Sequence, residues 1–181
     1  MSAAGPELLE APDFVEPLVA WRVWRVLGTA DGYRLGSVVK TALWPPGEAL
    51  RADCLHEPAF ASFLRRRSKP HHHAPEEACE CGIYAGRLSV IADYMAPTAT
   101  EPVAHVLGRV MLWGTVIECE RGFRASHAYP AHIYVPVGGV VAAGHRYALL
   151  AAALEVYGVP VEALDSPASE ATRRLERMMR S

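Results

Sequence analysis

Three histidines and two cysteines stand within eleven positions of the chain, in the segment HHHAPEEACEC at residues 71–81. Cys79 and Cys81 are separated by one residue, so on an extended backbone both side chains point to the same face. Two thiolates on one face can reach one ion, and Gly82 lets the backbone bend around it. This spacing indicates a metal site, because soft sulfur ligands select zinc and similar metals.

The other two cysteines lie on opposite sides of this pair along the chain. Cys54 precedes the pair by a helix-and-loop segment, and Cys119 ends a long β-like stretch. Four thiolates could close a tetrahedral site with Zn–S distances of about 2.3 Å. We therefore predict that zinc, or another thiophilic metal, is bound by four residues: Cys54, Cys79, Cys81 and Cys119.

Histidine could supply a ligand where a cysteine does not. His56 lies two residues after Cys54, and His73 ends the histidine run, so either could be a substitute ligand. The three adjacent histidines at 71–73 cannot all bind one ion, because neighbouring side chains point in different directions. At most one or two of them would be ligands, and an exposed polar loop is the alternative for the run.

The cysteines also permit two explanations without a bound metal. Cys54 and Cys119 could be small buried core residues, as free cysteines often are, with Cys79 and Cys81 reduced. Alternatively, Cys79 or Cys81 could be a nucleophilic thiol, or the two could form a strained disulfide that suits redox exchange.

An enzyme would need a further group near the metal or the thiol. Glu118 and Glu120 flank Cys119 and could act as a general base at an open metal site with three protein ligands and a water. His127 and His132, in the segment HAYPAH, could meet at a common rim. The chain has no G-x-x-x-x-G-K-[ST], G-x-G-x-x-G, G-x-S-x-G or H-E-x-x-H motif. These absences disfavour ATP-dependent, dinucleotide-dependent and common hydrolase chemistry.

The composition is that of a soluble globular protein, with 51% apolar and 21% charged residues. A net charge of −2 disfavours nucleic-acid binding as the main role. The basic cluster at 65–69 could be a solvated helix end, or it could contact a phosphate or a nucleic acid. No apolar run reaches the roughly 18 to 20 residues of a membrane span, and the first residues lack a secretory signal. We expect no membrane partner and a cytoplasmic location, where thiols stay reduced.

Most of the elements that must position these residues are predicted to be strands. Residues 21–44 favour a hairpin with its turn at 31–32, and residues 81–94 regain strand character. The stretch 103–136 is the most β-like, with a turn at 120–122 and a further short strand at 133–135. Alternation at period two predicts one face that carries Val106, Val110, Leu112 and Val116. Gly108 and Gly114 inside this run predict bulges or a close backbone approach.

Helical spacing appears in three segments. Residues 57–67 predict one short helix, followed by a loop with two prolines up to residue 78. Residues 145–157 carry an apolar stripe, which consists of Leu149, Leu150, Ala153, Leu154 and Tyr157. Gly158 is a natural helix stop, and Ser166 with Pro167 can begin a last, weaker helix.

Together these elements predict an α+β fold. It consists of a small, mostly antiparallel β-sheet or β-barrel, a metal-clipped helix–loop insertion, and one or two C-terminal helices. We divide the chain into a flexible leader at 1–18, a single β-rich domain at 19–163, and a C-terminal helix or tail at 164–181. Residues 55–78 offer few large apolar side chains, so we expect the metal to order them in place of a core of their own.

Two segments carry a resemblance to a known family. CECGIYA at 79–85 and LWGTVIECERGFRASHAYP at 112–130 together resemble a family of uncharacterised bacterial proteins, found mostly in actinobacteria. The shared pattern is C-x-C-G-I-Y-A, then L-W-G, E-R-G-x-R-A and A-Y-P, and the resemblance covers roughly residues 54–161. It implies a shared scaffold around these segments and carries over no activity, ligand or fold.

The sequence is therefore compatible with three functions. The first is a cytoplasmic, zinc-stabilised, β-rich binding or adaptor module whose partner is a protein or another macromolecule. The second is a metal- or thiol-dependent enzyme that uses the region of Cys79 and Cys81. The third is a nucleic-acid contact through the basic cluster at 65–69. A set of four cysteines without a catalytic signature favours the first.

Overall fold

The computed structural model describes residues 16–39, 42–54, 72–95, 104–136 and 147–164. Its first hairpin joins β1 (Leu18–Thr29) to β2 (Gly32–Ser37), with Thr29 paired to Gly32 next to the turn. Gly32 has a φ of 101°, a conformation that glycine adopts without steric cost, so the predicted turn is confirmed. The expected helix at 57–67 lies outside the described residues. Of the expected leader at 1–18, only residues 16–18 are described, and Leu18 begins β1. Of the expected C-terminal helix or tail at 164–181, only Leu164 is described.

A second, longer hairpin forms the centre of the fold. It joins β5 (His105–Cys119) to β6 (Gly122–Pro136), and Cys119 pairs with Gly122 at the turn. Val106, Val110 and Leu112 of the predicted face are fully buried, which confirms it there, whereas Val116 is only partly buried against the core. Residues 133–135, expected as a separate short strand, continue β6.

Both glycines of β5 are required by the backbone path. A Cβ at Gly108 would lie 2.2 Å from the His132 carbonyl oxygen, so the predicted close approach is confirmed. Gly114 has a φ of 75° and lies within the register shift between Trp113 and Val116, which is the predicted bulge.

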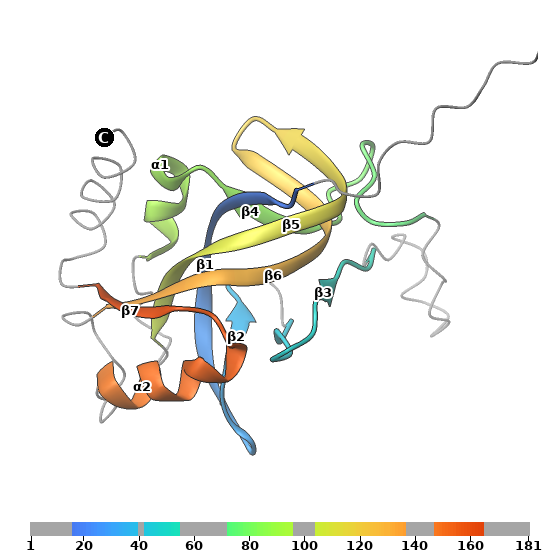
Figure 1. The fold of residues 1–181 in the computed structure, drawn as a ribbon. Coiled ribbons are helices and arrows are strands. Elements are labelled where there is room, and N and C mark those ends of the chain that lie inside the picture. Colours follow the sequence, from blue (N-terminus) through green and yellow to red (C-terminus); the bar gives the residue numbers. More distant parts are fainter. Residues whose placement is uncertain (1–15, 40–41, 55–71, 96–103, 137–146, 165–181) are drawn as a thin grey trace, which may run out of the picture.

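The seven described strands form one sheet (Figure 1). β1 pairs antiparallel with β5, which joins the two hairpins, and β4 (Ile83–Gly86) pairs with β6. β3 (Leu50–Arg51) pairs antiparallel with β6, and β7 (Val161–Leu164) pairs with β6 in parallel. The expected β-rich α+β fold is thus present. The barrel alternative is wrong for the described residues, because β2, β3 and β7 each have one strand neighbour and leave edges that a closed barrel lacks.

The helices are short and lie at the sheet's margins. α2 (Tyr147–Leu154) and the 3-10 helix η3 (Glu155–Tyr157) end at Gly158, whose φ of 66° confirms the predicted stop. Their stripe is buried at Leu150, Leu154 and Tyr157, whereas Leu149 is 59% exposed. In Figure 1, α2 lies beside β2 and β7. None of the described helices has the length and apolar character needed to cross a membrane.

Strand character after residue 86 is a wrong expectation. α1 (Leu88–Ile91) and the 3-10 helix η2 (Ala92–Met95) follow β4 directly. Leu88 and Met95 pack against Trp21 in a second, smaller apolar cluster. A short apolar run does not distinguish strand from helix by periodicity, so this packing decided the outcome.

Tyrosine hydroxyls connect α2 and η3 to the first hairpin. The Tyr157 hydroxyl accepts a hydrogen bond from the backbone N–H of Leu35 and donates one to the carbonyl of Trp44, both at 2.8 Å. Trp44 in turn packs edge to face on Trp24 in the main core. These contacts hold Trp44, which precedes β3 and Cys54 in the chain, against the core.

Candidate metal centre

Four potential metal ligands converge beside the sheet. They are Cys54, His72, Cys79 and Cys81, and one ligand atom of each lies within 4.8 Å of all the others. The Sγ atoms of Cys54 and Cys79 are 3.8 Å apart, and Nε2 of His72 lies 3.3 Å from Sγ of Cys81. The structure therefore brings together residues separated by 27 positions of sequence, from 54 to 81.

These separations fit a tetrahedral ion. With Zn–S and Zn–N bonds of about 2.3 and 2.05 Å, tetrahedral geometry places two sulfurs about 3.8 Å apart and a sulfur and a nitrogen about 3.6 Å apart. Two of the six pairwise separations, 3.8 and 3.3 Å, lie close to these values, and the others do not exceed 4.8 Å. The residues present therefore suit a zinc-sized, thiophilic ion.

β6 positions both arms of the site. On one side, β3 pairs with it and the backbone N–H of Ala52 donates to the Ser126 carbonyl at 2.8 Å, two residues before Cys54. On the other side, β4 pairs with β6 through Ile83 and Ala125, two residues after Cys81. Cys54 and Cys81 thus stand next to strands that are both hydrogen-bonded to β6, and this limits how far the two cysteines can separate.

The loop before β4 is closed by its own backbone. The N–H of Cys79 donates to the carbonyl of Glu76 at 3.1 Å. Gly82 has a φ of 124°, and a Cβ at this position would meet Cβ atoms of Arg124 and Pro75 at 3.1 Å. Glycine is therefore needed both for the conformation and for the space, and the predicted bend after the cysteine pair is confirmed.

The environment affects the two neighbouring thiols in opposite ways. A backbone hydrogen bond from Cys81 lowers the pKa of Cys79, and side-chain contacts with Cys81 and Cys54 act in the same direction. Burial raises the pKa of Cys81, and the neighbouring sulfur of Cys79 adds to this effect. A bound cation would favour the thiolate at both positions, since a coordinating thiol is deprotonated.

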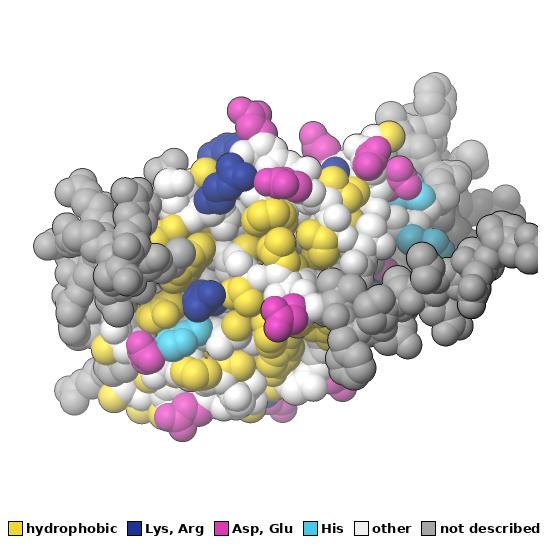
Figure 2. Space-filling view, turned by 45° about the horizontal axis from the view of Figure 1, so that its top comes forward, with side chains coloured by type: hydrophobic (Ala, Val, Ile, Leu, Met, Phe, Trp, Pro, Cys, Tyr) yellow, Lys and Arg dark blue, Asp and Glu magenta, His cyan; other side chains and the backbone are white. Residues whose placement is uncertain are grey.

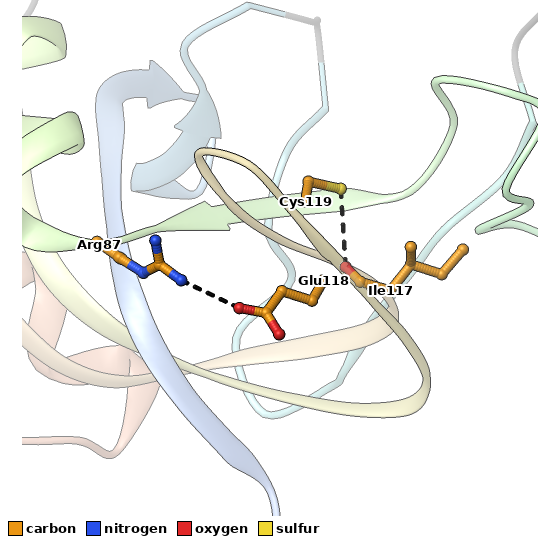
Figure 3. A network of polar contacts seen from close by, with 4 residues as sticks. All are labelled: Arg87, Ile117, Glu118 and Cys119. Carbon is orange, nitrogen blue, oxygen red and sulfur yellow. Dashed lines mark hydrogen bonds and ion pairs between the residues drawn. The ribbon is translucent and has the colours of Figure 1, made fainter.

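Cys119, predicted as the fourth ligand, lies outside this group. Its thiol stands at the end of β5, where it accepts a hydrogen bond from Nε of Arg124 at 3.3 Å and lies 3.8 Å from the carbonyl of Ile117. Figure 3 shows this thiol and the neighbouring Glu118 side chain, which reaches Arg87 at 3.0 Å. Glu118 and the exposed Glu120, both weighed as general bases, are likewise not among the clustered ligands.

His72 is the fourth member of the group. In the sequence it is only one member of the run 71–73, and His56 or His73 is the predicted substitute ligand. His73 is exposed and is not part of the group, while His56 and His71 lie outside the described residues. The signal for a histidine ligand was present in the run, but nothing local distinguishes His72 from its neighbours.

His127 and His132 do not meet, although both lie on β6. His127 stacks on Trp113 and places Nδ1 3.0 Å from the Ser126 hydroxyl. His132 pairs with Arg109 and has Nε2 3.2 Å from a Glu162 carboxylate oxygen. Because Arg109 and Trp113 are four residues apart on β5, the two histidines are separated by roughly 13 Å along the strands.

Charge on the described surface is mixed. On the face drawn in Figure 2, acidic side chains lie scattered beside the basic ones, and no broad basic patch is visible among the residues described there. The cluster at 65–69 falls outside the described residues. Nucleic-acid contact through that cluster stays a prediction.

Searches of protein-family models, curated proteins and solved structures found no match to this chain.

Proposed function

We propose that this chain is a β-rich binding module of the cytoplasm, stabilised by one structural zinc ion held by Cys54, His72, Cys79 and Cys81. The observation that supports the ion is the convergence of these four ligand atoms within 4.8 Å. Three thiolates and one imidazole form a ligand set that structural zinc sites use, and soft sulfur disfavours magnesium or calcium. Free cysteines at such a site fit a reducing compartment.

A binding role is favoured because four protein ligands complete a tetrahedral site. Catalytic zinc usually keeps only three protein ligands and a water, which the fourth side chain would displace here. Glu118, one of the two glutamates next to Cys119, is already paired with Arg87. The proposed partner is a protein or another macromolecule, and the zinc would hold the ligand loop in shape for it.

The experiment is metal analysis of untagged protein prepared under reducing conditions. Native mass spectrometry should give one zinc per chain. Alkylation should modify Cys54, Cys79 and Cys81 only after chelation, whereas the reactivity of Cys119 should change little because it lies outside the ligand group. A chain without metal whose four thiols are all modified at once would contradict the zinc centre.

A thiol-dependent activity is the second candidate, and one observation favours it. The sulfurs of Cys54 and Cys79 are 3.8 Å apart, and the backbone hydrogen bond from Cys81 lowers the pKa of Cys79. Both features are typical of reactive thiols. Under this alternative the protein as purified would contain no zinc, and Cys79 would be alkylated faster than Cys119.

A further inference from the structure

Arg124 is a nearly buried cation, 7% exposed, that faces the ligand loop from β6. Its Nη1, which carries two N–H donors, lies within hydrogen-bond distance of three loop carbonyls, those of Glu76, Cys79 and Cys81, and therefore shares at least one N–H between two of them. The Cys81 contact is 3.1 Å and the Glu76 contact is 3.3 Å. Its Nε donates to Sγ of Cys119 at 3.3 Å. One guanidinium thus joins the loop that carries two ligands to the end of the central hairpin.

We infer that Arg124 is a positioning residue of the metal centre and that Cys119 acts through it, as the acceptor that fixes the guanidinium, without binding the ion. This inference rests on the zinc centre proposed above. It assigns a role to the one cysteine that the ligand group leaves out.

The hydrogen bonds give the first argument. The three loop carbonyls are contacted in buried or partly buried surroundings, where a backbone acceptor needs a protein donor in place of water. A planar guanidinium carries five N–H donors in a fixed arrangement, so it can hold the loop carbonyls with one edge and Cys119 with another. A lysine ammonium has no such fork and could keep only part of the set.

Charge gives the second argument. Zinc with three thiolates and a neutral imidazole carries one net negative charge, and a nearly buried guanidinium against the loop offsets it. Glycine at position 82 leaves room for Arg124 beside the loop, because a Cβ at this position would lie 3.1 Å from Cβ of Arg124. Outer residues that orient metal ligands commonly contribute about 10- to 100-fold to metal affinity.

The test measures zinc affinity by chelator competition and the absorption spectrum of the Co²⁺-loaded protein, using full-length chain. We expect Arg124→Met to weaken zinc binding by about 10- to 100-fold, and Arg124→Lys to weaken it less. Cys119→Ala should weaken it more modestly, and Cys119→Ala added to Arg124→Met should cause no further loss, because Cys119 acts through the arginine. Arg87→Met is the control for loss of a surface cation, since Arg87 is paired only with the exposed Glu118 among the contacts described for it.

The cobalt spectrum separates the outcomes. Cys119→Ala should leave the thiolate-to-cobalt absorption per ion unchanged, whereas Cys79→Ala should reduce it. A loss of that absorption in Cys119→Ala would identify Cys119 as a ligand and overturn the inference. Additive losses of zinc affinity in the double variant would also overturn it. So would an Arg124→Met variant that binds zinc with wild-type affinity. If Arg124→Met does not fold, Arg124→Lys and Cys119→Ala provide the same comparison. Wild-type protein that binds neither zinc nor cobalt would overturn the metal centre itself.

Discussion

His72 and Cys81 face each other across the candidate metal centre, with Nε2 of the imidazole 3.3 Å from Sγ of the thiol. The adjacent His73 is exposed and outside the ligand group, so the chain supplies its own matched control. A zinc site worth about 10 to 16 kcal/mol depends on its complete ligand set, so loss of one ligand should lower the affinity at least about 100-fold, which corresponds to about 3 kcal/mol or more. We expect this loss of zinc affinity in His72→Ala and no change in His73→Ala, measured by chelator competition. Equal effects of the two substitutions would contradict the ligand assignment.

Cys79 and Cys81 should behave as one unit. Cys79→Ser and Cys81→Ser are each expected to lower the thermal midpoint of the zinc-loaded protein by similar amounts, because either change largely removes the ion's contribution. The double variant should melt close to the single ones, since little binding remains to be lost. Calorimetry of the three variants with and without chelator measures this. Independent, additive shifts that persist in chelator would show that the cysteines do not share an ion.

Val110 is fully buried at the centre of β5. Val110→Asp should prevent soluble folding, because an unpaired carboxylate would enter the core. Thr115→Asp introduces the same charge at an exposed position of the same strand and should remain soluble and cooperative. Expression, solubility and thermal melting of the two variants provide the measurement, and a cooperatively melting Val110→Asp variant would refute the packing of this face.

Gly114 and Gly47 have nearly the same φ, 75° and 76°, but different surroundings. A Cβ at Gly114 would lie 2.2 Å from the Ser126 hydroxyl, whereas nothing lies within 4 Å of one at Gly47. Alanine at Gly47 should therefore cost only the backbone strain, of order 1 kcal/mol, and alanine at Gly114 clearly more. Urea unfolding of both variants measures the difference. Equal losses of stability would mean that the bulge relaxes without disturbing Ser126.

Removal of the metal should loosen the ligand loop before the sheet. Residues 55–78 contain few large apolar side chains, whereas β5 and β6 are paired along most of their length and enclose the core. Chelation should therefore increase amide exchange in 55–78 while the strands 105–136 stay protected, as followed by hydrogen–deuterium exchange mass spectrometry. Unchanged exchange in 55–78 would show that something other than the metal orders this segment.

Local sequence patterns predicted the two hairpins and the flanking helix. Period-two alternation identified the buried face of β5, and glycines marked the turn at Gly32, the bulge at Gly114 and the helix end at Gly158. Each of these features depends on residues close together in the chain, so the sequence contains the whole signal. β3 and β7, with two and four residues, carry too short a pattern and are recognised only through their pairing with β6.

Cys79 and Cys81 are recognisable from the sequence as residues that could share a metal, because their spacing and the following glycine are local properties. Which residues complete the group depends on the tertiary structure. The pairing of β3 and β4 with the same strand β6 brings Cys54 and the 72–81 loop together, while the turn after β5 leaves Cys119 against Arg124. Three adjacent histidines cannot be distinguished by sequence, and His72 differs from His73 in the direction that the folded loop gives its side chain. Ligand choice here depends on strand register and loop path, which are set by contacts far apart in sequence.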